Sequence, residues 1–258
     1  MTILNFYDLG DPDGSPLLAV HGIKSHGLRF RRLATEAWPQ RRTIAVDLRG
    51  HGRSTPDGPW SIDRHIDDLI ETLDSLGLDQ IDVVGHSYGG AISLALLARA
   101  PQRVRSLVML DPALDQTGQW ATARAEDSLS NNSWESIDVA TAVHSEGLSD
   151  VAHSGVVEDI GQHLVHGADG RYRFRYHLPA VITGWGEMSK PLPSMIEVRP
   201  ALLVVADRAQ LVTARTESTL MQLFAGQLTT EHIDCGHMVY WEAFEELADA
   251  MIRFWSAH

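Results

Sequence analysis

The sequence predicts an α/β fold in which a doubly wound, mostly parallel β-sheet carries an inserted helical subdomain. Short apolar runs recur without polar alternation, which is typical of strands buried on both faces, and segments with helical periodicity separate them. This alternation favours a parallel, doubly wound arrangement. The alternation stops between Asp111 and Pro200. We therefore expect a core formed by residues 1–111 and 200–258, with residues 112–199 as a cap subdomain.

Five apolar runs predict the buried strands of the core. Each consists mainly of Val, Leu, Ile and Ala. The runs are LLAV (17–20), TIAV (43–46), IDVV (81–84), LVML (107–110) and ALLVV (201–205).

Three segments predict helices that pack on this sheet. Residues 62–76 carry an apolar stripe at helical spacing, and Ser61 is placed to cap their N-terminus. We expect the acidic residues of this segment to form a solvated face. These residues are Asp63, Asp67, Asp68 and Glu71. Residues 88–100 predict a helix whose Gly and Ala allow close approach to a sheet, and residues 243–255 predict the last helix.

The cap segment, residues 112–199, shows no clear strand–helix rhythm. It is too long for a loop, and its aromatic residues, Trp120, Trp134 and Trp185, argue against a disordered linker. We expect it to be largely helical.

Composition and charge restrict the class of function. The formal net charge of −13 on 258 residues argues against nucleic acid and against an anionic membrane surface as partners. No apolar run could span a bilayer, and the N-terminal segment does not resemble a signal peptide. The single cysteine, Cys235, excludes an internal disulfide and favours a cytoplasmic location. His163 and His166 lack a third ligand, so no zinc site is expected.

The segment GHSYGG (85–90) lies between a predicted strand and a predicted helix, which is the setting of a nucleophile elbow. The turn strains the serine backbone, so the residues two before and two after it must be small. Ser87 Oγ then projects from the sheet edge, beside helix N–H groups that favour an oxyanion. The sequence therefore predicts Ser87 as a nucleophile.

Two further segments supply partners for Ser87. HGIKSH (21–26) follows a predicted strand, so that the N–H groups of Ile23 and Tyr88 form a candidate oxyanion hole. DCGHMVYWE places His237 after the predicted last strand and before the last helix. A histidine in this position, after the serine in chain order, predicts a general base.

The chain resembles the α/β-hydrolase fold family, and in particular its branch of capped esterases, lactonases and C–C hydrolases. The segments that carry the resemblance are HGIKSH, DLRGHGRS (47–54), GHSYGG and DCGHMVYWE. The strand pattern extends it over nearly the whole core, whereas it is weak across the cap segment. The resemblance implies a triad in which Ser87 attacks a carbonyl and His237 takes its proton and returns it to the leaving group. It implies no metal or organic cofactor, and it leaves DLRGHGRS a structural role.

Two carboxylates are candidates for the acid of this triad. In the resembled family the acid most often follows the strand before the last one, but that position falls here on Ala209, and Asp207 lies two residues too early. The fold also uses an acid directly after the strand that follows the elbow helix, where this chain has Asp111. We expect Asp111 to be the acid, with Asp207 as runner-up. The alternative for Asp111 is a structural role at the start of the cap.

A basic and aromatic stretch in the cap, GRYRFRYH (170–177), suggests a contact with substrate. A strand with one packed and one solvated face is the ordinary explanation. The sharper hypothesis is that Arg171, Arg173 or Arg175 holds a carboxylate or phenolate of the substrate. Trp185 is a further candidate for the substrate pocket.

Three functions remain open from the sequence. The first is a serine hydrolase of a small, partly apolar ester, lactone or thioester, with the cap excluding water. The second is hydrolysis of a C–C bond in a vinylogous diketone by the same triad. The third is a non-catalytic ligand-binding protein on a hydrolase scaffold, which the unusual loop VVADRAQLVT (204–213) suggests. A haloalkane dehalogenase would need Asp in place of Ser87.

Overall fold

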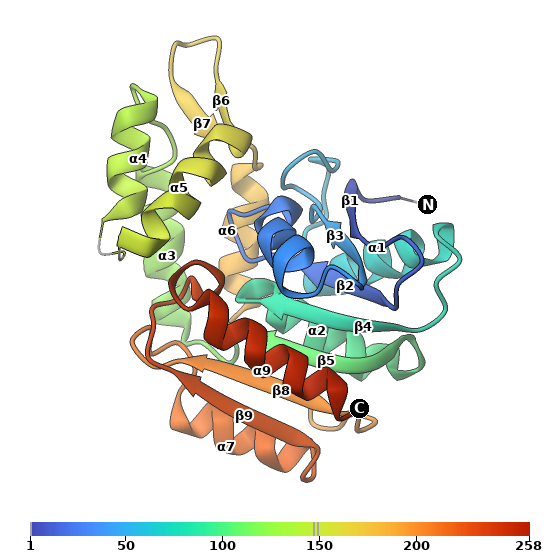
Figure 1. Cartoon of the computed structure of the whole chain (residues 1–258). Helices are drawn as coiled ribbons and strands as arrows, with labels where there is room; N and C mark the ends of the chain where they lie inside the picture. Colours follow the sequence, from blue (N-terminus) through green and yellow to red (C-terminus); the bar gives the residue numbers. More distant parts are fainter. Residues whose placement is uncertain (1, 147, 149) are drawn as a thin grey trace.

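The computed structural model describes residues 2–146, 148 and 150–258, and within them a seven-stranded sheet forms the centre of the molecule (Figure 1). Strand β1 pairs antiparallel with β3, and the other neighbouring strands are parallel. This confirms the predicted fold class. The strands in spatial order are β1 Phe6–Gly10, β3 Arg42–Val46, β2 Pro16–Val20, β4 Ile81–His86, β5 Val104–Leu110, β8 Ala201–Ala206 and β9 Leu228–Ile233.

Helices cover both faces of the sheet because successive strand residues point to opposite sides. Leu18 packs in one apolar cluster with Leu69 and Ile92, and its neighbour Leu17 packs in a second cluster with Leu247. The core helices are η1 Gly27–Phe30, η2 Leu33–Ala37, α1 Ile62–Ser75, α2 Tyr88–Arg99, η3 Pro101–Arg103, α7 Ala214–Leu223, α8 Val239–Glu242 and α9 Phe244–Ser256. Within the described residues, no helix is long and apolar enough to cross a membrane.

Helix α1 confirms the predicted N-cap at Ser61 and corrects the predicted solvated acidic face. The Ser61 hydroxyl accepts a hydrogen bond from Arg64 N–H at 3.3 Å, as expected of an N-cap. The prediction of a solvated acidic face is wrong for Asp68, which is fully buried and accepts two hydrogen bonds from Arg49, at 2.6 and 2.8 Å. Arg49 comes from the loop 47–54, a partner that spacing within the helix could not reveal.

The loop 47–54 is built around a buried carboxylate. Asp47 accepts hydrogen bonds from the backbone N–H groups of Gly27 and Arg53, at 2.8 and 2.9 Å. The loop is thereby attached to the segment that follows β2, and the Arg49–Asp68 pair attaches it to α1. These contacts explain a Gly-rich turn with a structural function.

The segment 112–199 contains four helices and a two-stranded hairpin among the described residues, and it rises over the side of the core where the arrows of β4 and β8 end (Figure 1). It has an apolar cluster of its own, which includes Trp134, Ile160 and Phe174. The elements are α3 Gly118–Ser130, α4 Ile137–Ser145, α5 Asp150–His163, β6 Leu164–His166, β7 Tyr172–Phe174 and α6 Leu178–Glu187.

Candidate active site

Ser87 occupies a strained turn between β4 and α2. Its φ of 55° and ψ of −118° lie in a region that residues with a side chain rarely adopt, and the side chain is buried. A Cβ at Gly85 would collide with the carbonyl oxygen of Gly89, and a Cβ at Gly89 would collide with that of Val20. The turn therefore requires small residues on both sides of the serine, as the sequence predicted.

Backbone hydrogen bonds hold this turn in place. Ser87 N–H donates to Leu110 O at 3.0 Å, and Ser87 O accepts from Gly90 N–H at 2.9 Å and from Ala113 N–H at 3.1 Å. The first bond ties the elbow to the neighbouring strand β5 and the last ties it to the start of the cap segment. A strained conformation persists only where surrounding structure determines it, which these bonds do.

The loop after β2 lies directly against the elbow. A Cβ at Gly22 would be 3.1 Å from the Cβ of Ser87, so Ile23 is placed beside the serine. His21 positions this loop: its Nδ1–H donates to Gly22 O at 2.7 Å and its Nε2 accepts from Leu48 N–H at 2.9 Å. Tyr88 N–H is the first of α2 and has no partner within its helix. The two predicted oxyanion donors therefore flank Ser87.

His237 binds Asp111. Its Nδ1–H donates to Asp111 Oδ2 at 2.6 Å. Asp111 directly follows β5, is fully buried, and accepts a second hydrogen bond at Oδ1 from Ala206 N–H at 3.3 Å. Because a buried carboxylate is stable only when it is paired and hydrogen-bonded, these two donors account for a charge at this position. The arrangement leaves His237 Nε2 as the ring nitrogen that can act as a base.

Asp207 binds a different histidine. Its Oδ1 accepts from His232 Nδ1–H at 2.7 Å, and His232 Nε2 lies 3.3 Å from Glu217 Oε1. The hydrogen bond to Asp207 raises the pKa of His232, with burial opposing this shift and Glu217 adding to it. Asp207 and His232 are both about half exposed. The loop after β8 is therefore engaged with β9 and α7.

His86 packs against the ring of His237. The ring centroids of His86 and His237 are 4.6 Å apart, and His86 Nε2–H donates to His237 O at 2.9 Å. Burial lowers the pKa of His86 well below its usual value, so this ring is neutral. Burial raises the pKa of the Cys235 thiol to about 12, which disfavours the nucleophilic thiolate form at neutral pH.

The cap helix α6 covers the elbow. A Cβ at Gly184 would collide with Ile23 Cδ1 and would lie 3.4 Å from the Tyr88 ring. Its neighbour Trp185 donates from Nε1 to Ser128 Oγ at 2.9 Å and meets the Trp120 ring edge-on at 5.5 Å. Trp185 thus lies where α6 packs on α3, next to the loop that carries Ile23.

Among the described residues, the side chains of the three arginines in the cap hairpin are not seen to contact those around Ser87. Arg171 Nε donates to Ser133 Oγ at 2.8 Å, Arg173 Nη1 donates to Asp169 Oδ1 at 2.8 Å, and Arg175 is exposed. These contacts lie within the cap segment and give no support for a role in substrate binding. The ordinary explanation, a strand with one packed and one solvated face, accounts for them.

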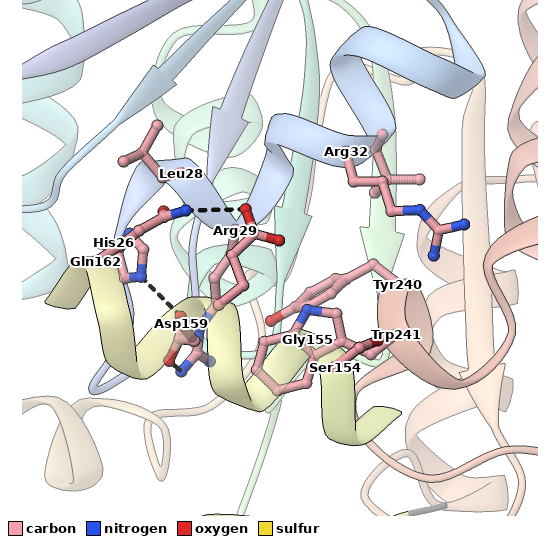
Figure 2. Close-up of a pocket in the computed structure, with 12 residues that line it drawn as sticks. His26, Leu28, Arg29, Arg32, Ser154, Gly155, Asp159, Gln162, Tyr240 and Trp241 are labelled. Atoms are coloured by element: carbon pink, nitrogen blue, oxygen red, sulfur yellow. Dashed lines mark hydrogen bonds and ion pairs between the residues drawn. The ribbon is translucent and has the colours of Figure 1, made fainter. Parts of the chain in front are cut away.

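A cavity of about 170 Å³ lies at the junction of core and cap, beside the site (Figure 2). Asp159 of α5 binds His26 Nε2 at 2.7 Å and accepts two hydrogen bonds from Arg29, at 2.8 and 2.6 Å. Burial alone would raise the pKa of Asp159, but Arg29 and the His26 hydrogen bond outweigh it and hold that pKa far below its usual value. The sequence did not reveal this cluster, because Asp159 is 130 residues from Arg29 and 133 from His26.

This cavity is not the reaction site. Ser87, Asp111 and His237 are absent from its lining, and it approaches them only through Tyr240, whose ring is 4.9 Å from that of His86. Across the described residues, no group of three or more His, Cys, Asp or Glu side chains could hold a metal ion.

The fold and this geometry agree with the comparison to known proteins. A family model described as alpha/beta hydrolase fold matches residues 15–244. The chain belongs to the α/β-hydrolase fold family. The elbow, the loop after β2 and the His237 loop are the parts of that fold that carry its chemistry.

Similar proteins include enzymes of two kinds. The lipase LipV of Mycobacterium tuberculosis is 33% identical over 226 residues, 86% of this chain and 86% of the lipase. A 2-hydroxymuconate semialdehyde hydrolase of Pseudomonas sp. strain CF600 is 38% identical over 114 residues, 42% of this chain and 40% of that enzyme. The crystal structure of E-2-(acetamidomethylene)succinate hydrolase has a TM-score of 0.86 at 23% identity, covering 98% of this chain and 95% of the other. This α/β-hydrolase chain is an enzyme, so the hypothesis of a non-catalytic binding protein is not retained.

Proposed function

We propose that this α/β-hydrolase is a serine hydrolase that cleaves a small, partly apolar ester, lactone or thioester through an acyl-enzyme on Ser87. The observation that carries the proposal is the convergence of a strained, buried serine with a histidine held by a buried aspartate. His86, the residue before the serine, supports the proposal, because its ring packs on His237 and its Nε2–H donates to the His237 carbonyl.

The proposed reaction has two halves. In the first, His237 Nε2 takes the proton of Ser87 Oγ, the oxygen attacks the carbonyl carbon, and the N–H groups of Ile23 and Tyr88 stabilise the oxyanion. His237 then gives the proton to the departing alcohol or thiol, which leaves an ester on Ser87. In the second half, water attacks that ester with His237 as base, and the carboxylic acid is released. Asp111 holds the ring tautomer and stabilises the imidazolium.

We further propose that the partner of this enzyme is a small-molecule substrate and that it acts in the cytoplasm. The net charge of −13 supports the first statement, and the single cysteine supports the second. The triad needs neither a metal nor an organic cofactor for this reaction.

A fluorophosphonate probe tests the nucleophile. We expect covalent labelling of the wild type and none of Ser87→Ala. Ser136→Ala is a matched control, because Ser136 also lies at a helix N-terminus but caps α4 with its side chain. Labelling of Ser87→Ala, or an unlabelled wild type, would refute the acyl-enzyme.

Hydrolysis of a C–C bond in a vinylogous diketone is the second candidate function. The 38% identity to a 2-hydroxymuconate semialdehyde hydrolase favours it, although that match spans only 42% of the chain. Turnover of simple aryl esters alongside inertness toward 2-hydroxy-6-oxo-dienoates supports the ester hydrolase. The opposite pattern supports the C–C hydrolase.

A further inference from the structure

Lys24 lies in the loop after β2 that carries Ile23, here called the oxyanion loop. Its backbone has a strained conformation that the surrounding structure must hold. Its φ of 57° is left-handed, and it directly follows Ile23. Its side chain is 24% exposed, and desolvation lowers its pKa, with Asp127 opposing this shift and Arg124 adding to it. A cation is thus partly removed from water at the point where the loop after β2 meets the cap.

The carboxylate nearest to Lys24 compensates its charge only in part. Nζ lies 3.8 Å from Asp127 Oδ2 on α3, too far for a hydrogen bond. Asp127 is half exposed, and its Oδ1 already accepts a hydrogen bond from Asn131 at 2.7 Å. No hydrogen bond from Lys24 Nζ occurs among the residues that the structure describes. Three donors therefore remain for a ligand.

A second cation, Arg124, and two indole rings lie near Lys24. Lys24 Nζ is 5.9 Å from the centroid of the Trp185 ring, and Trp185 meets Trp120 edge-on. Arg124 of α3 lies with Cζ 5.7 Å from the Trp120 ring, and in the described part of the chain it has no carboxylate within 4 Å. Lys24 and the exposed Arg124 thus each lie near an indole ring where α3 and α6 meet the loop after β2.

We propose that Lys24 and Arg124 bind a carboxylate of the substrate, so that the preferred substrates are esters or lactones whose acyl part carries a carboxylate. This inference rests on the proposed function of the Ser87 site. Charge-assisted hydrogen bonds to a carboxylate satisfy the partly desolvated donors of Lys24, and the exposed Arg124 supplies a second positive charge near them. A local cation pair is also what an anionic substrate requires to approach a protein of net charge −13.

Matched substrates test the proposal. The probes are mono-p-nitrophenyl esters of glutaric, adipic and pimelic acid, each against the neutral p-nitrophenyl ester of equal acyl length. We expect the wild type to prefer an acidic ester. Lys24→Met should lower kcat/KM for that ester by about ten- to a hundredfold, mainly through KM, since hydrogen bonds to charged groups are lost, and should leave the neutral ester unchanged.

Two variants separate this effect from loss of folding. The only other lysine, Lys190, is bound to Glu187 at 2.8 Å, so Lys190→Met is the control and should leave both activities unchanged. Asp127→Asn removes the competing carboxylate and should increase kcat/KM for the acidic ester alone. Equal loss on acidic and neutral esters in Lys24→Met, or a wild type without preference for any acidic ester, would overturn the proposal.

A binding measurement keeps the inference distinct from the serine mechanism. Calorimetry with adipate on Ser87→Ala needs no turnover. We expect binding, and weakening of about tenfold or more when Lys24→Met is added. Equal affinity in the two proteins, or absence of adipate binding, would overturn the carboxylate site even if Ser87 is the nucleophile. Loss of binding in the double variant would support the site even if Ser87→Ala still reacts with the fluorophosphonate.

Discussion

Two carboxylate–histidine pairs lie at the ends of the neighbouring strands β5 and β8. The hydrogen bonds within the two pairs have nearly the same length. His237 Nδ1 is 2.6 Å from Asp111, and His232 Nδ1 is 2.7 Å from Asp207. Their surroundings differ. Asp111 is fully buried and accepts a further backbone hydrogen bond, and His237 is 37% exposed. Asp207 and His232 are both about half exposed, and His232 also faces a second carboxylate, Glu217.

The difference shows that a short hydrogen bond does not by itself indicate catalysis. At an exposed pair water screens the charges and competes for both groups, so the aspartate does little to orient the ring. Where the carboxylate is fully buried, as Asp111 is, water screens the same bond less, and the bond holds one tautomer and one orientation of the histidine ring. Burial and position beside Ser87 distinguish the pair that we propose to act.

The largest expected effect tests the Asp111–His237 pair. Asp111→Asn should lower kcat by a factor on the order of 10³–10⁴ with KM little changed, because the amide favours the wrong tautomer of His237. Steady-state kinetics on an activated ester measure this. If Asp111→Asn remains active while Asp207→Asn is crippled, the assignment of the two pairs is reversed.

The second effect tests whether burial of an aspartate beside a histidine is sufficient for a role in catalysis. Asp159 is also buried and also binds a histidine, but it is paired with Arg29 at the junction of core and cap (Figure 2). Asp159→Asn leaves Arg29 without its partner and should lower the free energy of unfolding by about 3–5 kcal/mol. The kcat of the folded protein should fall less than about tenfold. Urea unfolding and kinetics measure the two quantities.

The control for this variant is its neighbour on the exposed side of α5. Glu158 pairs with Arg31 where both side chains are more than 40% exposed, so Glu158→Gln should change stability by less than about 1 kcal/mol. Because the pKa of Asp159 is lowered in the folded state, its contribution is present above the unfolded value of about 4 and is lost as pH falls below it. A difference between Asp159→Asn and wild type that does not shrink in acid would contradict this account.

The third effect concerns the exposed pair. Asp207→Asn should reduce kcat less than about tenfold, because Asp207 does not contact His237. The variant is compared with Asp111→Asn on the same substrate. A loss above a hundredfold would show that the loop after β8 rearranges toward His237 during the reaction.

The smallest effect is the pH dependence of the exposed pair. The pKa of His232 is raised in the folded state, so the pair stabilises the protein below the unfolded value of about 6.5, and this contribution is lost as pH rises through the folded value. Because the pair is half exposed, we expect Asp207→Asn to lower stability by less than about 1 kcal/mol at acidic pH and by less still at alkaline pH. A larger loss of stability at alkaline pH than at acidic pH would contradict the raised pKa of His232.

The sequence predicted the parts of the fold that depend on local pattern. The five apolar runs became β2, β3, β4, β5 and β8, and Ser61 became the cap of α1. It did not predict β1, because that edge strand is half buried and contains Asp8 and Gly10, nor α7, whose sequence is polar on most positions. Periodicity detects an element only when burial imposes a pattern on it.

The resemblance to the α/β-hydrolase family limited the acid of the site to two residues, each of which follows a predicted strand. The sequence could not decide which histidine each aspartate meets, since His237 is 126 residues from Asp111 and the ring of His232 lies between Asp207 and Glu217. The same holds for the burial of Asp68 under Arg49, the Asp159 cluster, and the position of Lys24 beside α3. Local pattern determines which residues form each strand and helix, whereas the partners of a charged side chain depend on distant segments that only the folded chain brings into contact.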